Sequence, residues 1–171
     1  MNPLSTNRLQ LTEITFEDAP FIIELLNSPD WLQFIGDRNV KTTADANAYI
    51  QRSYIHYYKK YGFGMYKMVL TETNQPIGVC GLVKRDYLEH HDIGFAILPD
   101  YYRKGFTYEA ASAVMKYATQ TIQLHPILAF TSRDNIASQS LLLKLGLHFE
   151  KYIKIPNDEE ILMLYSTDTK K

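Results

Sequence analysis

Apolar and polar residues alternate in short segments along much of the chain, and a period of two is typical of β-strands with one buried face. Residues 74–76 (Asn-Gln-Pro) and 156–158 (Pro-Asn-Asp) are turn sequences, so each is expected to join its neighbouring strands into a hairpin. The expected strands are 8–14, 65–71, 77–84, 91–98, 127–131, 147–155 and 160–165.

Between these strands, apolar positions recur every three or four residues, which is the spacing of amphipathic helices. Thr15 and Asp18 favour the start of a first helix that carries apolar residues as far as Leu26. Ser28 as N-cap and Pro29 in the first turn favour a second, short helix. The remaining expected helices are 43–62, with Thr43 as its cap and Gly62 as its stop, 107–123 and 135–145.

The order of these elements predicts a mixed α/β architecture of packed layers. Residues 91–131 form a strand-helix-strand unit, which favours a right-handed parallel crossover. The chain has 171 residues, is 46% hydrophobic and contains no linker-like stretch, so we expect a single domain over 1–171.

The charge balance and the cysteine content exclude several classes of protein. With 18 Lys and Arg against 19 Asp and Glu, the net charge of −1 gives no basis for general nucleic-acid binding. Cys80 is the single cysteine, which excludes an intramolecular disulfide. The first residues lack the apolar core of a signal peptide, and no apolar run reaches the ~18 residues of a membrane span. We therefore expect a cytoplasmic protein that binds neither nucleic acid nor membrane.

The segment between the strand 91–98 and the helix 107–123 has the composition of an anion site. Backbone N–H groups at a helix start attract phosphate, and Gly105 allows a ligand to approach the backbone closely. Arg103 and Lys104 add positive charge. The loop has neither the Walker spacing nor the dinucleotide glycine pattern, and an ordinary turn with solvated basic side chains is the alternative.

A second helix start, at Asn135 and Ser138, has residues that either cap the helix or face a ligand. Together with the basic loop it carries a resemblance. The segments PDYYRKGFTYEA and RDNIASQSLLLKLGL resemble the GNAT N-acetyltransferase superfamily. The segments STNRLQLTEITFEDA and PIGVCGL resemble its branch that contains the ribosomal-protein N-terminal acetyltransferases. The resemblance extends over about residues 8–165.

This resemblance implies a GNAT-like α+β fold: a mixed, mostly antiparallel sheet that splays between two parallel strands, with helices on both faces. It also implies acetyl-CoA as cosubstrate. The pantetheine arm would pair with the backbone of Ile97 and Leu98, and Asn135 and Ser138 would face the thioester. The pyrophosphate would be bound by Arg103, Lys104, Gly105, Phe106, Thr107 and Tyr108.

The chain departs from the family pattern at Tyr102, where Gln or Arg is usual, and at Thr107, where Gly or Ala is usual. Leu142 stands where many members have a tyrosine proton donor. In the ribosomal-protein branch a serine is the proposed donor instead, and Ser138 is the matching residue.

The expected reaction is direct attack of a primary amine on the thioester, with the amine supplied by a protein N-terminus or a small molecule. Asp92 and His90 are the candidate bases because strand alternation places them on one face. Solvent-exposed positions, or a metal site that also includes His91, are the alternatives. Glu109 reads as a first-turn residue that favours the helix dipole rather than as a base. Cys80 reads as an inert buried residue rather than as a nucleophile.

Two further questions stay open at this level. The aromatic residues Trp31, Tyr54, Tyr57 and Tyr58 either line an acceptor cleft or belong to the core. A non-catalytic acyl-CoA sensor and an unrelated nucleotide-phosphate binder remain alternatives to an enzyme, and either a monomer or a homodimer fits the sequence.

Overall fold

The computed structural model describes residues 4–156 and 159–168, which form an eight-stranded sheet in the order β1-β2-β3-β4-β5-β6-β8-β7. Neighbouring strands are antiparallel except β5 and β6. The strands are β1 (Leu4–Ser5), β2 (Leu9–Glu13), β3 (Met65–Leu70), β4 (Pro76–Val83), β5 (Asp92–Ile97), β6 (Leu128–Thr131), β7 (His148–Lys154) and β8 (Ile161–Ser166). The mixed, mostly antiparallel sheet is therefore confirmed. The turn expected at 156–158 falls largely outside the described residues.

The helices also follow the expected order, with shifts at their ends. They are η1 (Phe16–Asp18), α1 (Ala19–Leu26), α2 (Pro29–Phe34), α3 (Thr43–Ile50), η2 (Gln51–Ile55), α4 (His56–Tyr61), η3 (Pro99–Tyr101), α5 (Phe106–Lys116), η4 (Tyr117–Thr121) and α6 (Ile136–Lys144). Gly62, in a left-handed conformation, ends α4 as expected. No helix within 4–156 and 159–168 combines the length and the apolarity needed to cross a membrane.

One of the expected helix caps was wrong. The cap of α3 is Thr42 rather than Thr43, because the Thr42 hydroxyl accepts a hydrogen bond from the Asp45 N–H at 3.2 Å. Ser28 is the N-cap residue of α2, as expected, but its hydroxyl donates back to the Leu25 carbonyl at 2.7 Å and makes no capping hydrogen bond to the new helix.

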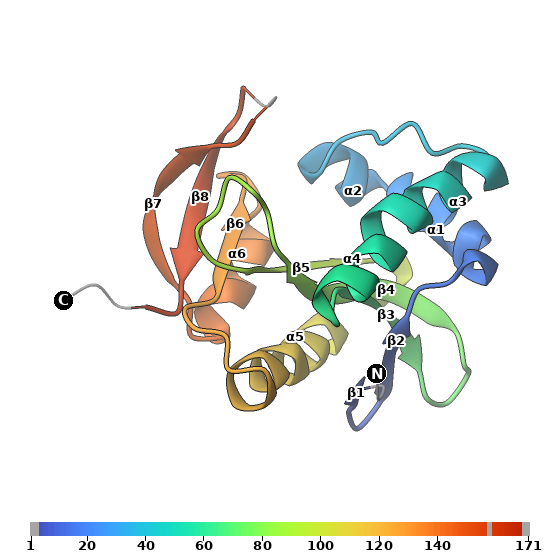
Figure 1. Ribbon diagram of the computed structural model, residues 1–171, viewed down its shortest axis with the longest axis horizontal. Helices are drawn as coiled ribbons and strands as arrows, with labels where there is room; N and C mark the ends of the chain where they lie inside the picture. Colours follow the sequence, from blue (N-terminus) through green and yellow to red (C-terminus); the bar gives the residue numbers. More distant parts are fainter. Residues whose placement is uncertain (1–3, 157–158, 169–171) are drawn as a thin grey trace.

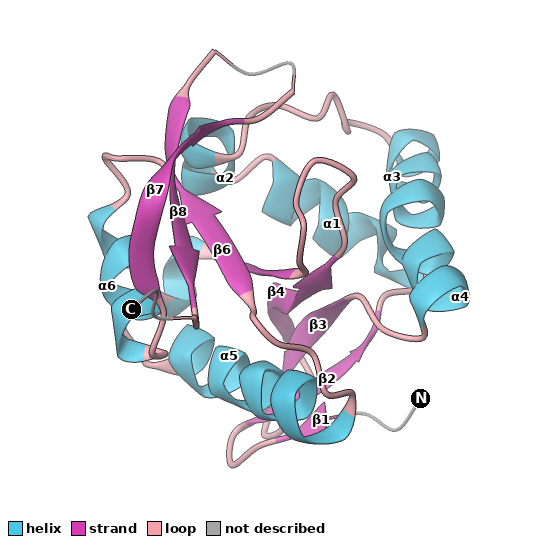
Figure 2. Cartoon of the chain, turned by 60° about the vertical axis from the view of Figure 1, so that its left-hand side comes forward, coloured by secondary structure: helices cyan, strands magenta, loops and turns pink. Residues whose placement is uncertain are grey.

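Helices cover both faces of the sheet (Figures 1 and 2). Helices α5 and α6 contribute to one buried cluster, in which Cys80 and Leu82 of β4 also lie. Helices α1, α2 and α3 pack in a second cluster with Val79, the neighbouring residue of β4. Successive residues of β4 thus point into opposite layers, as strand alternation requires.

The two parallel strands touch at one end only. Asp92 of β5 is paired with Leu128 of β6, and the Leu128 N–H donates to the His91 carbonyl at 2.8 Å. Beyond this contact the register continues between β5 and β4 but not between β5 and β6. The sheet therefore opens between β5 and β6, and the opening separates strands β1 to β5 from strands β6 to β8 (Figure 1).

The tyrosine-rich helix and Trp31 belong mainly to the core rather than to an acceptor wall. Tyr54 and Trp31 are buried, and the Tyr58 hydroxyl donates to the Met65 carbonyl while accepting from the Ile14 N–H. Tyr57 is only half-buried, and its hydroxyl donates to the Lys84 carbonyl at 3.0 Å. These contacts fix the helix against β2, β3 and the end of β4.

Candidate active site

The loop after β5 has an unusual backbone that suits an anion. It leads from η3 to α5, and both Arg103 (φ 59°) and Gly105 (φ 79°) are left-handed. Glycine adopts this conformation without penalty, whereas a residue with a Cβ is disfavoured there by roughly 1–2 kcal/mol. Strained backbone of this kind gathers at ligand-binding loops, where surrounding contacts hold it in place.

The start of α5 leaves its donors available. Gly105 is the N-cap and has no side chain with which to satisfy the first N–H groups of the helix. These groups have no partner within the helix, and the helix dipole adds partial positive charge at the same end. The backbone of the sequence-predicted loop, from Arg103 to Tyr108, therefore fits a phosphate group.

Arg8, which the sequence did not single out, holds this loop from the turn between β1 and β2. Its Nη1 donates to the Lys104 carbonyl at 3.0 Å, and its Nε lies 2.7 Å from Glu109 Oε2. The guanidinium also lies 4.3 Å from the centre of the Phe106 ring. Nothing in the local pattern indicated this role, because Arg8 is about a hundred positions away from its partners.

Glu109 anchors Arg8 rather than acting on a ligand. Its Oε1 accepts from the Arg8 N–H at 2.8 Å and from the Thr6 hydroxyl at 2.6 Å. Burial alone would raise the pKa of Glu109, but the hydrogen bonds from Thr6 and Arg8 outweigh it and lower the pKa below its ordinary value. Glu109 is thus a charged structural partner in the first turn of α5, consistent with the exclusion of a base at this position.

Further basic and aromatic groups surround the loop. Lys104 Nζ lies 5.4 Å from the Tyr101 ring centre, and Lys144 Nζ, from the end of α6, lies 4.1 Å from the Tyr108 ring centre. Lys144 was also missed, because only the packing of α6 brings it to the start of α5. At the departure Tyr102, burial and the carboxylate of Asp30 raise the pKa of the phenol, so it stays neutral.

The backbone of β5 directs part of its hydrogen-bonding groups into the opening of the sheet. The Leu98 N–H donates to the Ile77 carbonyl at 2.8 Å, and the Leu98 carbonyl accepts from the Tyr101 N–H at 3.0 Å. Backbone N–H and C=O groups point alternately to the two sides of a strand. The backbone groups of Ile97 and Phe95 therefore point away from β4, toward the space between β5 and β6. The expected pairing of a ligand with Leu98 is corrected accordingly, since its N–H is already used by β4.

Asn135 caps α6, which is one of the two roles that the sequence allowed for it. Its Oδ1 accepts a hydrogen bond from the Ser138 N–H at 3.0 Å. This bond fixes the orientation of the amide and the position of Ser138 in the first turn, where its side chain is half-buried. The hydroxyl of Ser138 thus lies on a rigid element, the helix that follows β6.

Asp92 is held in an ion pair, which overturns the expectation of an available base. Its carboxylate is buried and lies 3.0 Å from Arg85 Nε. Burial raises the pKa of Asp92, and the Arg85 guanidinium opposes that rise. Arg85 also lies 4.9 Å from the Phe130 ring centre, so the pair ties β5 to β6 where they meet. The Asp92 carboxylate therefore stabilises the fold and is not available as a base.

His90 and His91 precede β5 instead of belonging to it. His91 packs edge-on against Phe63, with ring centres 5.3 Å apart, and burial lowers its pKa. His90 lines a cavity of about 330 Å³ together with Leu128, the β6 residue at the parallel contact. His90, His91 and Asp92 do not form a metal site, and residues 4–156 and 159–168 contain no group of three or more His, Cys, Asp or Glu side chains that could hold a metal ion.

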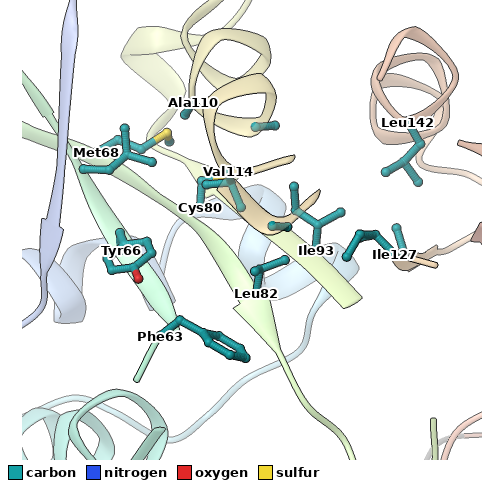
Figure 3. Close-up of a cluster of buried hydrophobic side chains, with 14 of the residues drawn as sticks. Phe63, Tyr66, Met68, Cys80, Leu82, Ile93, Ala110, Val114, Ile127 and Leu142 are labelled. Atoms are coloured by element: carbon teal, nitrogen blue, oxygen red, sulfur yellow. The ribbon is translucent and has the colours of Figure 1, made fainter. Parts of the chain in front are cut away.

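Leu142 and Cys80 lie in the core that Figure 3 shows. Leu142 is 1% exposed and points toward the Ile127 region, so this position supplies packing and no proton. Cys80 is fully buried in β4, and burial raises its pKa well above the ordinary thiol value. A thiol that is neither accessible nor ionised cannot serve as the nucleophile of a two-step transfer.

The chain shares this arrangement with known proteins. Residues 8–148 match the acetyltransferase (GNAT) domain family. The chain belongs to the GNAT acetyltransferase family. It is 31% identical over 153 residues to the uncharacterized N-acetyltransferase YoaA of Bacillus subtilis, covering 88% of this chain and 85% of that protein. It is therefore an acetyltransferase by family, as the resemblance implied.

Solved structures confirm the GNAT fold. The acetyltransferase from Agrobacterium tumefaciens superposes with a TM-score of 0.83 at 20% identity, covering 99% of this chain and 95% of that one. The ribosomal L7/L12 α-N-protein acetyltransferase RimL in complex with coenzyme A gives 0.77 at 16% identity, covering 98% and 100%. At these identities the likeness concerns the fold alone.

Proposed function

We propose that this GNAT acetyltransferase uses acetyl-CoA and transfers the acetyl group directly to a primary amine, either a protein N-terminus or a small amine. The observation that carries the proposal is the series of backbone N–H groups along β5 and at the start of α5 that neither β4 nor the helix itself uses. It begins at Phe95 and Ile97, passes the left-handed residues Arg103 and Gly105, and ends at the uncapped start of α5.

Each part of this run suits one part of the cosubstrate. The amide-containing pantetheine arm is complementary to a free strand edge, as in β-augmentation by peptides. The pyrophosphate is complementary to the N–H groups of Gly105 and Phe106 with the nearby charges of Arg103 and Lys104. Lys144 and Tyr108 extend the positive, aromatic surface to one side.

The chemistry requires one bond to form and one to break. The neutral amine nitrogen attacks the thioester carbonyl carbon, and the C–S bond breaks as the amide C–N bond is completed. A backbone N–H of β5 would stabilise the oxyanion. The nitrogen loses a proton, and the departing thiolate of coenzyme A gains one, so that the products are an amide and a free thiol.

Ser138 is the proposed proton donor to the thiolate; the proposal is supported by its half-buried position in the first turn of α6, the helix that follows β6. His90 stays a candidate for the proton that leaves the amine, because it lines the cavity beside the closed end of the opening. An α-amino group, with a pKa near ~8, is partly neutral at physiological pH, so water also suffices as acceptor. Asp92 has no part in this proposal.

The assignment to a cytoplasmic, single-domain monomer or homodimer stays a prediction. The function is tested by two measurements on the wild-type chain. Acetyl-CoA, but not ATP, is expected to raise the unfolding temperature, and thiol release from acetyl-CoA is expected to depend on an added amine. Stabilisation without amine-dependent thiol release across α-amino peptides and small amines would favour an acyl-CoA sensor; stabilisation by ATP alone would favour a nucleotide binder.

A further inference from the structure

The contact between Arg8 and the loop before α5 bears on the orientation of a single peptide plane. Arg8 Nη1 donates to the Lys104 carbonyl at 3.0 Å, and this carbonyl lies between the two left-handed residues Arg103 and Gly105. The carbonyl of Lys104 and the N–H of Gly105 belong to the same peptide plane. Among the described residues the cis peptide bond is His125–Pro126, so the plane at Lys104 is trans.

In a trans peptide the C=O and the N–H point in opposite directions. When Arg8 fixes the Lys104 carbonyl on its own side of the loop, the Gly105 N–H is turned to the other side. Gly105 is also the N-cap of α5, whose first N–H groups no capping side chain satisfies. A rotation of this single plane would replace a donor by a carbonyl oxygen in the place of the anion.

The remaining contacts of Arg8 make its position rigid. Nε lies 2.7 Å from Glu109 Oε2, the backbone N–H donates to Glu109 Oε1 at 2.8 Å, and the guanidinium stacks 4.3 Å from the Phe106 ring centre. Nη2 lies 3.4 Å from where a Cβ on Gly105 would be. The guanidinium therefore packs from the β1–β2 turn against three parts of the loop: the Lys104 carbonyl, the helix start at Phe106, and Gly105.

We propose that Arg8 is a positioning residue for the cosubstrate: it orients the Lys104–Gly105 peptide so that the Gly105 N–H faces the pyrophosphate. This inference rests on the proposed function, since it assumes that acetyl-CoA binds at the loop. It differs from direct charge attraction, because the guanidinium acts through a neutral carbonyl and its charge is already matched by Glu109.

The test compares two acetyl donors, acetyl-CoA and acetyl-pantetheine, which lacks the pyrophosphate. Arg8→Ala is expected to lower kcat/KM for acetyl-CoA about tenfold, through KM, and to leave kcat/KM for acetyl-pantetheine within about twofold of wild type. Arg8→Lys keeps the positive charge but not the planar fork, so it is expected to resemble Arg8→Ala. The matched control is Arg52→Ala, because Arg52 also stacks on an aromatic ring, at 5.0 Å from Tyr49, but lies far from the loop in sequence and belongs to another helix.

Three results would overturn the inference. Equal losses with both donors would show that Arg8 only stabilises the fold. Full rescue by Arg8→Lys would show that its charge matters and not its geometry. An unchanged KM for acetyl-CoA in Arg8→Ala would show that the peptide plane does not need it. Failure of the proposed function is distinguishable, because the wild-type chain would then show no turnover with acetyl-CoA at all.

Discussion

Two segments flank β5, and they differ in what their conformation provides. The loop at its C-terminal end, from Pro99 to Glu109, exposes backbone donors and holds them in place with side chains. The segment at its N-terminal end, from Lys84 to Asp92, uses charged side chains for internal contacts: the buried Asp92 pairs with Arg85, Arg85 lies over the Phe130 ring, and Lys84 donates to the Leu88 carbonyl. In the proposed function the first end receives the ligand, whereas the contacts at the other end hold the two halves of the sheet together.

The contrast shows that acidic and basic residues near a site need not serve its chemistry. Asp92 lies where a base would be useful, yet its carboxylate is matched by Arg85. Glu109 lies in the first turn of α5, yet its carboxylate is paired with Arg8 and hydrogen-bonded by Thr6. In both segments the carboxylate holds neighbouring elements in place, and in the proposed function the main chain of the loop contacts the ligand.

The largest loss of stability is expected where β5 and β6 pair, at the N-terminal end of β5. Asp92→Ala leaves the buried part of Arg85 without its partner, and breaking a buried pair in this way typically costs about 3–5 kcal/mol. Urea unfolding would measure the loss. The affinity of the folded variant for acetyl-CoA, measured by calorimetry, is expected to stay close to wild type. A stable Asp92→Ala variant with abolished turnover would instead restore Asp92 as the base.

In the loop after β5 we expect the opposite outcome, a loss of affinity for acetyl-CoA. Gly105→Val places a β-branched side chain at φ 79°, and the strain of roughly 1–2 kcal/mol or more is expected to lower acetyl-CoA affinity at least about tenfold. Gly62→Val is the matched control, since Gly62 has φ 73° with nothing within 4 Å of a Cβ, at the end of α4. It should lose stability but keep its affinity. Equal affinity losses in both variants would remove the distinction between the two segments.

These two predictions also show which part of the site the sequence reveals. The loop was predictable because its features are local: a glycine, two basic residues and a helix start within a few positions. Arg8 and Lys144 were not, because their roles depend on which distant elements pack together. The short β1 was missed for the same reason, since two residues show no period and form a strand only by pairing with β2.

The ion pair of Asp92 was missed although Arg85 is only seven residues away. Alternation places side chains on faces, but residues 84–91 form turns in which no period applies. Whether a carboxylate in such a segment is solvated, catalytic or paired depends on the path of the turn. The mixed α/β architecture, by contrast, follows from the order of long periodic segments and was predicted correctly, and the mostly antiparallel, splayed sheet was implied by the family resemblance.

A smaller effect is expected at Ser138. If its hydroxyl donates a proton to the leaving thiolate, Ser138→Ala lowers kcat about tenfold and leaves the calorimetric affinity for acetyl-CoA unchanged, because the loss falls on the transition state. Ser140→Ala is the control on the exposed side of the same helix. An unchanged kcat in Ser138→Ala would transfer the donor role to solvent.

The smallest effect is a pH dependence of the Arg8–Glu109 pair. The pKa of Glu109 is lowered in the folded chain, so its contribution to stability is present above the ordinary value of 4.5 and is lost as the pH falls below it. The difference in unfolding free energy between wild type and Glu109→Gln should therefore shrink with acidification. Urea titrations at several pH values would measure it, and a difference that grows toward acid would contradict the lowered pKa.

A crystal structure of the wild-type chain with coenzyme A bound would decide most directly whether the loop is the ligand site. We expect the pyrophosphate oxygens to lie about 2.7–3.2 Å from the N–H groups of Gly105 and the first residues of α5. The Lys104 carbonyl should still face Arg8, and the pantetheine arm should pair with the backbone of Ile97 and Phe95. Coenzyme A bound elsewhere, or a Gly105 N–H turned away from the phosphate, would contradict the assignment of this loop.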